Sequence, residues 1–419
     1  MIVLVFTSSY PYDDSLEQTF LETEIEILKS RFDRVILVPK SRMGVLLPMP
    51  EGVEVDETYS AFLKNVNYIR AGWMAASAPF LYRDLLANPA IWTKPSALKR
   101  LIVYTASARL TCEWVEAWFK TWRNNDDCVV FYTYWFDSAT MGIGLSKERH
   151  PDLKLVSRAH GYDLYEDRYP VPYLPCRPQA LDLTDAVFPD SFAGEEYLRN
   201  RYPAFRSKIN AAFLGVKDSA GVSRSSTDGV FRIVSCAVIR PVKRVDLILE
   251  GIACAARMRP SQRFEWHHFG NGQLPGVRET LQRRADEMLP ANAVAFLPGY
   301  SDQKALLDFY LKNSLDVFVN VSESEGTPVS IMEAISCGLP VIATAVGGNQ
   351  EIVTMDNGTL LDRKLSPEHV AGALIWYLDH PAEAQAKGRA SRMLWQERYD
   401  ALRNFNEFAE RLVELRSKE

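Results

Sequence analysis

Short apolar runs alternate along the chain with stretches in which apolar residues recur at helical spacing. In the first half, five runs show little alternation between polar and apolar side chains, as in strands of a parallel sheet covered on both faces. Residues 18–30, between the first two runs, have the spacing of an amphipathic helix, which completes a βαβ unit. The five predicted strands are residues 2–6, 35–38, 129–133, 154–157 and 186–188.

The pattern restarts after a polar segment, residues 217–229, which has few large apolar side chains and is typical of an interdomain linker. Beyond it, the apolar runs predict a second set of strands and helices. The strands are residues 231–235, 264–269, 293–296, 316–320 and 340–344, and the helices are residues 245–258, 276–288, 303–311 and 329–337.

This order predicts an α/β protein with two Rossmann-like, doubly wound domains. Because ligands bind outside the carboxyl ends of such strands, we expect the two sheets to share a central cleft. Transferases, epimerases, binding proteins and dehydrogenases all have this architecture, but neither half opens with the Gly-x-Gly-x-x-Gly of a dehydrogenase. We place an N-terminal domain at residues 1–216, a linker at 217–229, a C-terminal domain at 230–394 and a helix returning toward the first domain at 395–419.

Composition narrows the class of partner. The 419 residues include 48 Lys+Arg and 53 Asp+Glu, a formal net charge of −5, which argues against a protein that coats nucleic acid. The scattered cysteines form no Cys-x-x-Cys pair and indicate free thiols in a reducing compartment. The apolar start lacks a basic leader and predicts a strand rather than a secretory signal, so we expect a cytoplasmic protein without a spanning helix.

The most informative segment follows the predicted strand 316–320. Pro328 is expected at the first position of a helix, which places the peptide N–H groups of Thr327 and Val329 where phosphate oxygens bind well. Two carboxylates eight positions apart, Glu325 and Glu333, could hold one extended ligand at two points. A capping acid followed by a solvated helical glutamate is the alternative interpretation. The segment reads Glu325-Gly326-Thr327-Pro328-Val329-Ser330-Ile331-Met332-Glu333.

Together with the later Gly347-Gly348, this segment resembles the donor-site signature of the retaining GT-B glycosyltransferases of family 4, the glycosyl transferases group 1, which include bacterial enzymes of polysaccharide biosynthesis. The resemblance extends over essentially the whole chain and is strongest over residues 231–362. It implies a GT-B fold in which Glu325 binds the donor sugar and Glu333 the nucleotide ribose. The donor-binding residues between them are then Gly326, Thr327, Pro328 and Val329.

A basic loop follows the first predicted strand of the second domain. A lysine there could neutralise a diphosphate leaving group as a point charge, and the family resemblance implies this catalytic role for Lys243. Val238 occupies the usual arginine position of the family, and Arg240 is the candidate substitute. An exposed basic loop is the alternative interpretation of Lys243 and Arg244.

His160 follows the strand predicted over residues 154–157 and precedes Gly161, a residue that lets backbone approach a ligand closely. A lone histidine is more often structural, but the family carries a similar His-Gly pair, which implies that His160 is catalytic and faces the donor sugar. Arg158 and Asp163 are expected beside it. Four further donor-binding residues are predicted after strand ends, namely Gly270 and Gly272 near the nucleotide and Tyr300 and Ser301 at its base.

The first loop, residues 7–17, lacks the glycine pair that related enzymes often place near the phosphates. This favours an acceptor-binding role for Tyr12 or Glu17. Trp135, after the strand over 129–133, is a candidate for stacking on a sugar, with core packing as its rival. The chain has no Asp-x-Asp and no cluster of His and carboxylates, so we expect no metal and no cofactor, with the leaving-group charge met by Lys243, Arg240 and the helix N-terminus.

Residues 60–123 carry nine Lys or Arg against three acidic residues, and five of the nine tryptophans. Basic helices with interfacial aromatic residues are typical of contact with a membrane surface. Helices packed on the first sheet, with their tryptophans in the core, are the alternative. The five tryptophans are Trp73, Trp92, Trp114, Trp118 and Trp122.

The resemblance implies a retaining hexosyltransferase that moves a sugar from a nucleotide-sugar, with UDP favoured, to a glycan or lipid-linked acceptor in surface polysaccharide biosynthesis. No carboxylate is placed as a covalent nucleophile, so front-face attack is implied. A GT-B sugar-nucleotide epimerase, or a silent nucleotide-sugar-binding scaffold of a polysaccharide assembly complex, are alternatives. No nucleic-acid partner is expected, and the protein is expected in the cytoplasm or peripheral on the cytoplasmic face of a membrane.

Overall fold

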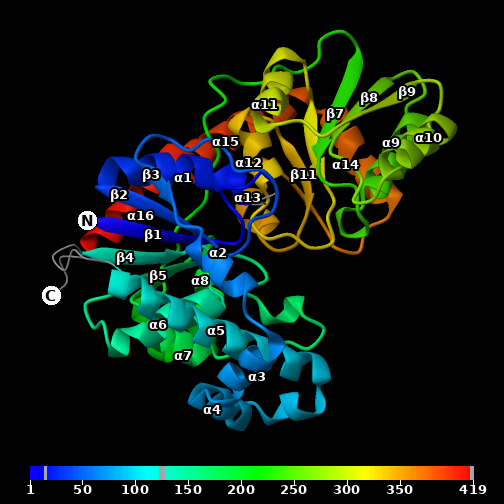
Figure 1. Cartoon of the computed structure of the whole chain (residues 1–419). Helices are drawn as coiled ribbons and strands as arrows, with labels where there is room; N and C mark the ends of the chain where they lie inside the picture. The colour runs from blue at the N-terminus through cyan, green and yellow to red at the C-terminus, as the bar shows by residue number, and fades with distance from the viewer. Residues whose placement is uncertain (14–16, 122–127, 416–419) are drawn as a thin grey trace. The chain divides into compact units, whose positions relative to one another are not determined.

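The computed structural model describes residues 1–13, 17–121 and 128–415, and the chain divides into two compact units (Figure 1). Unit 1 comprises Met1–Leu214 with Leu402–Glu419, and unit 2 comprises Gly215–Ala401. Part of the predicted first loop, residues 14–16, lies outside the described residues, as do Trp122 and Arg123 of the basic region and the end of the predicted C-terminal helix.

Unit 1 is built on a six-stranded parallel sheet with the order β3-β2-β1-β4-β5-β6. All five predicted strands are confirmed. The prediction missed β3, which has three residues and only partial burial. The strands are β1 (Ile2–Thr7), β2 (Arg34–Pro39), β3 (Val53–Val55), β4 (Val129–Thr133), β5 (Lys154–Ala159) and β6 (Ala186–Pro189).

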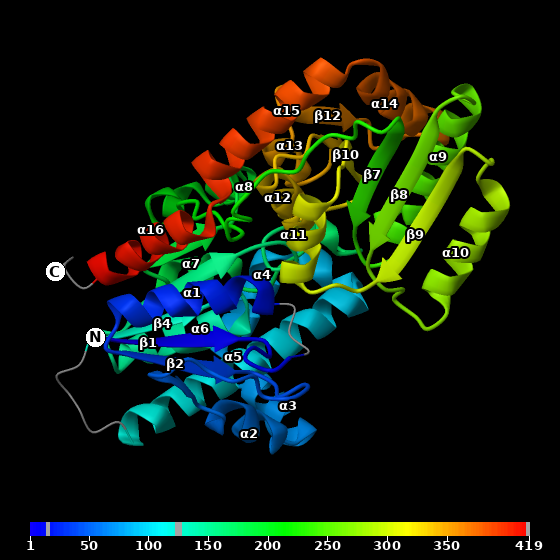
Figure 2. The same ribbon diagram turned by 90° about the horizontal axis from the view of Figure 1, so that it is seen from above.

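Helices cover both faces of this sheet. On one face, α1 lies beside α16, and a fully buried ion pair between Glu24 of α1 and Arg158 of β5 (3.0 Å) packs against Phe408 of α16 (Figure 2). On the other face, Trp114 and Trp118 of α5 pack against the apolar sheet residues. The helices are α1 (Gln18–Arg31), α2 (Thr58–Lys64), α3 (Tyr68–Ala76), α4 (Pro79–Ala87), α5 (Pro95–Thr121), α6 (Ser138–Leu145), α7 (Arg177–Leu183), α8 (Phe192–Arg201) and α16 (Ala401–Glu414).

Unit 2 repeats the same strand order, here β12-β11-β10-β7-β8-β9. The five predicted strands and four predicted helices are confirmed within one residue at their ends, except that β9 extends three residues beyond its predicted end. The prediction missed β12, which is short and only partly buried. The strands are β7 (Val230–Cys236), β8 (Arg263–Phe269), β9 (Ala293–Gly299), β10 (Val317–Asn320), β11 (Val341–Thr344) and β12 (Gly358–Leu361).

Apolar helices pack on the second sheet. The central core joins α9 and α14 to Ile233 of β7 and Trp266 of β8. None of the helices in the described parts of the chain is both long and apolar enough to cross a bilayer. The helices of unit 2 are α9 (Val245–Met258), α10 (Val277–Met288), α11 (Gln303–Lys312), α12 (Val329–Ser336), α13 (Asn349–Ile352), α14 (Pro367–Asp379) and α15 (Pro381–Leu394).

Two boundaries differ from the prediction. The polar segment 217–229 belongs to unit 2 and is anchored there, because Asp218 pairs with Arg392 (2.7 Å) and the Ser219 hydroxyl donates to the carbonyl of Ser336 (3.0 Å). The helix predicted from residue 395 begins at Ala401 instead, since Trp395–Tyr399 continue α15 as one π-helical turn. Polar composition alone does not distinguish a free linker from a segment whose side chains find partners.

Candidate functional site

The first and fourth strands lie side by side at the centre of each sheet, β1 with β4 and β7 with β10. The chain leaves these neighbours in opposite directions, and the resulting crevice at their carboxyl ends is where doubly wound sheets bind ligands. In unit 2, the loop after β7 carries Lys243 and the loop after β10 carries Glu325. The fold therefore brings two residues that are 82 positions apart to one crevice.

Lys243 and Glu325 form a close ion pair. The Lys243 ammonium donates to both carboxylate oxygens of Glu325, at 2.6 and 2.7 Å, and the Asn320 amide donates to the same carboxylate at 3.2 Å. The side chains of Lys243 and Glu325 are only 17% and 7% exposed. A charge-assisted pair that is this shielded from water is held more firmly than a surface ion pair, so the two charges are fixed in place before a ligand arrives.

Arg244 shapes the two loops that carry this pair. Its backbone is left-handed (φ 49°, ψ 41°) at the start of α9, and its guanidinium donates to the carbonyls of Val321 (2.7 Å) and Ser322 (3.0 Å). The loops are also joined by a bond from the Glu323 N–H to the Val242 carbonyl at 2.8 Å. Arg244 thus joins the two loops through hydrogen bonds and is not part of an exposed basic loop. Its neighbours in the sequence did not indicate this role.

The front of α12 adjoins Glu325. The helix begins at Val329, and Pro328 is the capping residue before it, one position earlier in the helix than predicted. The N–H groups in the first turn of a helix have no acceptor within the helix, and the helix dipole favours an anion there. The four predicted donor-binding residues 326–329 therefore surround a helix N-terminus next to the Lys243–Glu325 pair.

Glu333 lies inside α12 and is 6% exposed. Burial raises the pKa of its carboxyl to about 7, and the Gln303 amide donates to it at 2.9 Å. A carboxyl that holds its proton near neutrality can both donate to and accept from a diol such as a ribose. The prediction found Glu333 but missed Gln303 and Asn320. Only the position of Asn320 at a strand end was a sequence signal for either.

The structure shows a packing role for two of the predicted glycines. Gly270 has φ 138°, and a side chain there would lie 2.0 Å from the Ala237 carbonyl oxygen. A side chain at Gly272 would lie 2.5 Å from Val277. Both glycines let loops of unit 2 press against one another, and their contact with a nucleotide stays a prediction. Tyr300 is 74% exposed, while Ser301 beside it is half-buried and Arg240 is exposed.

In unit 1, His160 is 8% exposed at the carboxyl end of β5. Its ring packs against Tyr134 and Trp135, with centroids 4.6 and 4.7 Å away. Neither ring nitrogen makes a hydrogen bond within the described parts of the chain, and Nδ1 lies 3.9 Å from the Asp163 carboxylate. A nearly buried imidazole without a hydrogen bond is unusual and is consistent with a group that meets a ligand.

Glu17 holds the first loop of unit 1 together. Its carboxylate accepts from the backbone N–H groups of Ser8 (2.8 Å), Ser9 (3.2 Å) and Tyr10 (3.2 Å), and from the indole N–H of Trp135. The Tyr12 hydroxyl, which is also predicted to bind an acceptor, donates to Glu57. These contacts give Glu17 a structural task, and the acceptor-binding roles of Tyr12, Glu17 and Trp135 stay predictions.

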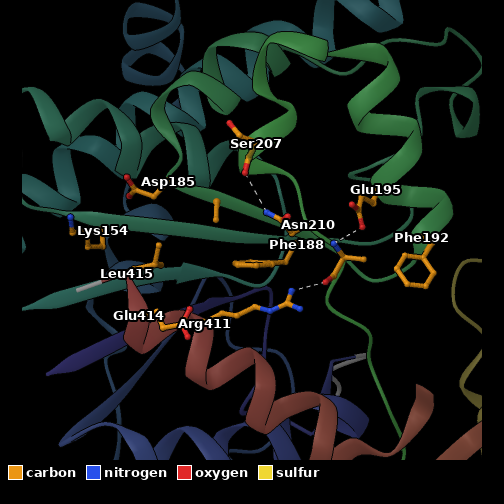
Figure 3. A pocket seen from close by; sticks show the side chains of 12 residues that line it. Lys154, Asp185, Phe188, Phe192, Glu195, Ser207, Asn210, Arg411, Glu414 and Leu415 are labelled. Atoms are coloured by element: carbon orange, nitrogen blue, oxygen red, sulfur yellow. Dashed lines mark hydrogen bonds between the residues drawn. The ribbon is translucent and has the colours of Figure 1, made fainter. Parts of the chain in front are cut away.

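Unit 1 also contains a cavity of about 490 Å³ away from these residues (Figure 3). Lys154 at the start of β5 and Asp185 just before β6 lie on its wall, so it adjoins the amino ends of these strands, whereas His160 follows the carboxyl end of β5. No predicted site residue lines it. Over residues 1–13, 17–121 and 128–415, no three His, Cys, Asp or Glu side chains are placed to hold a metal ion.

Comparison with known proteins shows sequence similarity over the part of the chain that contains Lys243, Glu325 and Glu333. Residues 223–393 match the family model described as glycosyl transferases group 1. A D-inositol 3-phosphate glycosyltransferase of Mycolicibacterium smegmatis is 31% identical over 179 residues, which cover 41% of this chain and 40% of that relative's own length. The chain therefore matches less than half of this curated relative.

Two solved structures share the fold over nearly their full length. The Anabaena protein HepE, in complex with UDP and glucose, is 14% identical with a TM-score of 0.61, and 98% of this chain and 99% of HepE are covered. A sucrose-phosphate synthase from Thermosynechococcus elongatus is 15% identical with a TM-score of 0.68, and both chains are covered completely. The GT-B fold class is confirmed. Residues 223–393 are therefore similar to the glycosyl transferases group 1, and the whole chain shares the GT-B fold.

Proposed function

We propose that this protein is a retaining hexosyltransferase that moves a sugar from a nucleotide-sugar donor, UDP-linked in the favoured case, to a hydroxyl of a glycan or lipid-linked acceptor in surface polysaccharide biosynthesis. The observation that carries the proposal is the buried Lys243–Glu325 pair at the crevice of unit 2, within the segment that matches the family model. Solved structures with the same fold support the donor class, because the Anabaena protein HepE is in complex with UDP and glucose and the pneumococcal O-GlcNAc transferase GtfA with UDP and GlcNAc.

In this proposal, the diphosphate of the donor binds at the N-terminus of α12. Lys243 turns from Glu325 toward the phosphates and neutralises the charge that develops on the leaving group. Glu325, freed from that pair, accepts hydrogen bonds from hydroxyls of the donor sugar, while Glu333 binds the ribose with Gln303 behind it. The ion pair thus holds both side chains in place until Lys243 binds the phosphates and Glu325 binds the sugar.

In the proposed reaction, His160 of unit 1 binds the donor sugar through a hydrogen bond. Its ring nitrogens, which make no hydrogen bond within the described parts of the chain, can hydrogen-bond to a sugar hydroxyl. The acceptor hydroxyl attacks the anomeric carbon from the face that the phosphate leaves, and its proton passes to the departing phosphate oxygen. Configuration is thereby retained without a covalent enzyme intermediate.

The test is consumption of nucleotide-sugars by the purified protein. Wild type should hydrolyse or transfer from at least one UDP-sugar, while Lys243→Ala and Glu325→Ala should each lose about a hundredfold or more in turnover. Lys364→Ala is the matched control, because Lys364 is an exposed lysine of the same unit. Equal activity of all variants, or turnover of no donor, contradicts the proposal. Anomeric analysis of the product by NMR tests retention, and an altered sugar released without acceptor would indicate an epimerase.

Nucleotide binding without any turnover would instead indicate a silent scaffold. Thermal shift with UDP, GDP and ADP separates this outcome from a failure to bind, because ligand binding to the folded state raises its melting temperature. We also propose that no metal is required, so that turnover is unchanged in EDTA. The proposed location is the cytoplasmic face of a membrane.

A further inference from the structure

Unit 1 carries a helical insertion between β3 and β4 that exposes many apolar side chains. Figure 1 shows α3 and α4 outside α5, on the side away from β1 and β2. Isolated exposed apolar residues are normal on a protein surface, whereas a concentration of them marks an interaction site. Eight large apolar side chains with exposed fractions of 40% to 96% fall within 36 residues. They are Tyr68, Ile69, Trp73, Tyr82, Leu86, Trp92, Ile102 and Val103, which we call the α3–α5 surface.

The aromatic members of this surface are fixed by their polar ends. The Trp92 indole N–H donates to the Leu85 carbonyl at 2.9 Å, and the Tyr82 hydroxyl donates to the Ala76 carbonyl at 2.6 Å. The rings themselves remain 60% and 51% exposed. Because such a ring is already ordered, it loses little conformational entropy when binding removes it from water.

The exposed charges on the insertion are mostly positive. Between residues 58 and 112, the only acidic residue is Asp84, which is 2% exposed and accepts a hydrogen bond from the Tyr173 hydroxyl. Four basic residues of the same stretch are exposed, and their side chains make no hydrogen bond or ion pair with any described residue. They are Lys64, Arg83, Lys94 and Lys99. Glu113, the next acidic residue along the chain, is 40% exposed and forms an ion pair with Arg70 of α3. The surface around the exposed aromatic residues therefore carries a net positive charge, because the four basic residues above have no acidic partner among the described residues.

The tryptophans of the wider basic region divide into two groups. Trp114 and Trp118 are 4% and 8% exposed and belong to the core beneath the sheet, so for them the membrane interpretation was wrong. Trp73 and Trp92 are 72% and 60% exposed. The expected contact is thus confined to α3, α4, the 3-10 turn Pro89–Thr93 and the first turns of α5.

We propose that the α3–α5 surface binds the interfacial layer of a lipid bilayer that contains anionic lipids. Apolar and aromatic side chains enter the boundary between headgroups and acyl chains, and the surrounding lysines and arginine pair with phosphate groups. The membrane is favoured over a protein partner because exposed apolar and aromatic side chains surrounded by an excess of basic residues are typical of surfaces that bind anionic lipid. Since none of these residues lies in the donor site, the membrane contact does not depend on the proposed transfer reaction.

Co-sedimentation of the full chain with vesicles tests the contact. Vesicles of phosphatidylglycerol and phosphatidylcholine should bind wild type at low salt, vesicles of phosphatidylcholine alone should bind much less, and added salt should weaken binding. The double variant Ile69→Glu/Trp73→Glu should bind the anionic vesicles at least about tenfold more weakly. Reversal of charge in Lys94→Glu/Lys99→Glu should have a comparable effect.

The matched control is Met355→Glu/Met393→Glu, because both methionines are exposed (90% and 59%) but lie in unit 2. It carries the same added charge and should bind vesicles nearly as well as wild type. Quenching by brominated lipid gives a second readout, since Trp73→Phe/Trp92→Phe should lose most of the quenching while still sedimenting. The proposal is overturned if wild type does not bind anionic vesicles, if the control loses as much binding as Ile69→Glu/Trp73→Glu, or if that variant abolishes a dimer of this chain instead.

Discussion

The two units share one strand order but use the crevice beside their first strand differently. In unit 1, the carboxylate at that place is Glu17, which is occupied by three backbone N–H groups and an indole. In unit 2, it is Glu325, which is held by the side chains of Lys243 and Asn320. Backbone partners cannot leave without unfolding the loop, whereas side-chain partners can rotate away. The same fold therefore builds a fixed loop in one unit and an exchangeable ion pair in the other.

The largest expected effect comes from removing the cation of that pair. Lys243→Met removes the only positive charge of this pair and leaves the buried Glu325 carboxylate uncompensated, although the Asn320 amide still donates to it. We therefore expect unit 2 to lose about 3–5 kcal/mol of stability. The double variant Lys243→Met/Glu325→Gln removes both charges and should recover most of the loss. Thermal and urea unfolding measure this, and a double variant less stable than the single one would contradict the exchangeable pair.

The next effect concerns pH and Glu333. Its folded pKa, raised by burial to about 7, lies above the usual value of 4.5, so between those values the folded state holds a proton that the unfolded state has lost. Stability should therefore fall as pH rises through this window, by about 3 kcal/mol in total. Glu333→Gln should flatten the melting temperature between pH 5 and pH 8, and an unchanged slope would show that this carboxyl titrates normally.

A smaller loss is expected in unit 1. Glu17→Ala removes the acceptor of three backbone N–H groups, which should reduce stability by about 2 kcal/mol. The donor KM should not change at a temperature where the variant is folded. Glu26→Ala, an exposed position of α1, is the control. A Glu17 variant that unfolds like wild type but loses acceptor affinity would replace the structural role with the predicted acceptor role.

The smallest effect is expected at Tyr300. Because its side chain is 74% exposed, Tyr300→Ala should change stability by less than about 0.5 kcal/mol. Loss of a ring stacked on the base should raise the donor KM roughly fivefold, corresponding to about 1 kcal/mol of stacking. Steady-state kinetics with varied donor measures this, and an unchanged KM would remove Tyr300 from the base-binding residues.

The sequence predicted the fold well because buried parallel strands are continuous apolar runs. It missed β3 and β12, where short, half-exposed edge strands leave no such run. The spacing of Glu325 and Glu333 was visible along the chain, but their partners were not. Gln303 comes from α11, thirty positions away, and only packing of one helix on another brings it to Glu333.

The same limit explains the residues whose surroundings the sequence did not reveal. Glu17 and Arg244 have the polarity of ligand-binding residues, and only the folded loops show that backbone groups occupy them. Trp73 of α3 and Trp118 of α5 both belong to the basic region of the sequence, yet Trp118 is buried and Trp73 is exposed. Helix orientation decides that difference, and composition does not contain it.

The glycine pair after β11 has a consequence for how this protein can vary. A side chain at Gly347 would lie 2.0 Å from the Glu325 carbonyl oxygen, and one at Gly348 would lie 2.2 Å from that of Gly326. The loop with Gly347 and Gly348 therefore packs directly against the backbone of the loop with Glu325 and Gly326. This contact explains why the sequence signature includes both segments. Across descendants of this gene, residues 347 and 348 should change only in company with the acidic loop that they support, although neither needs to touch a substrate.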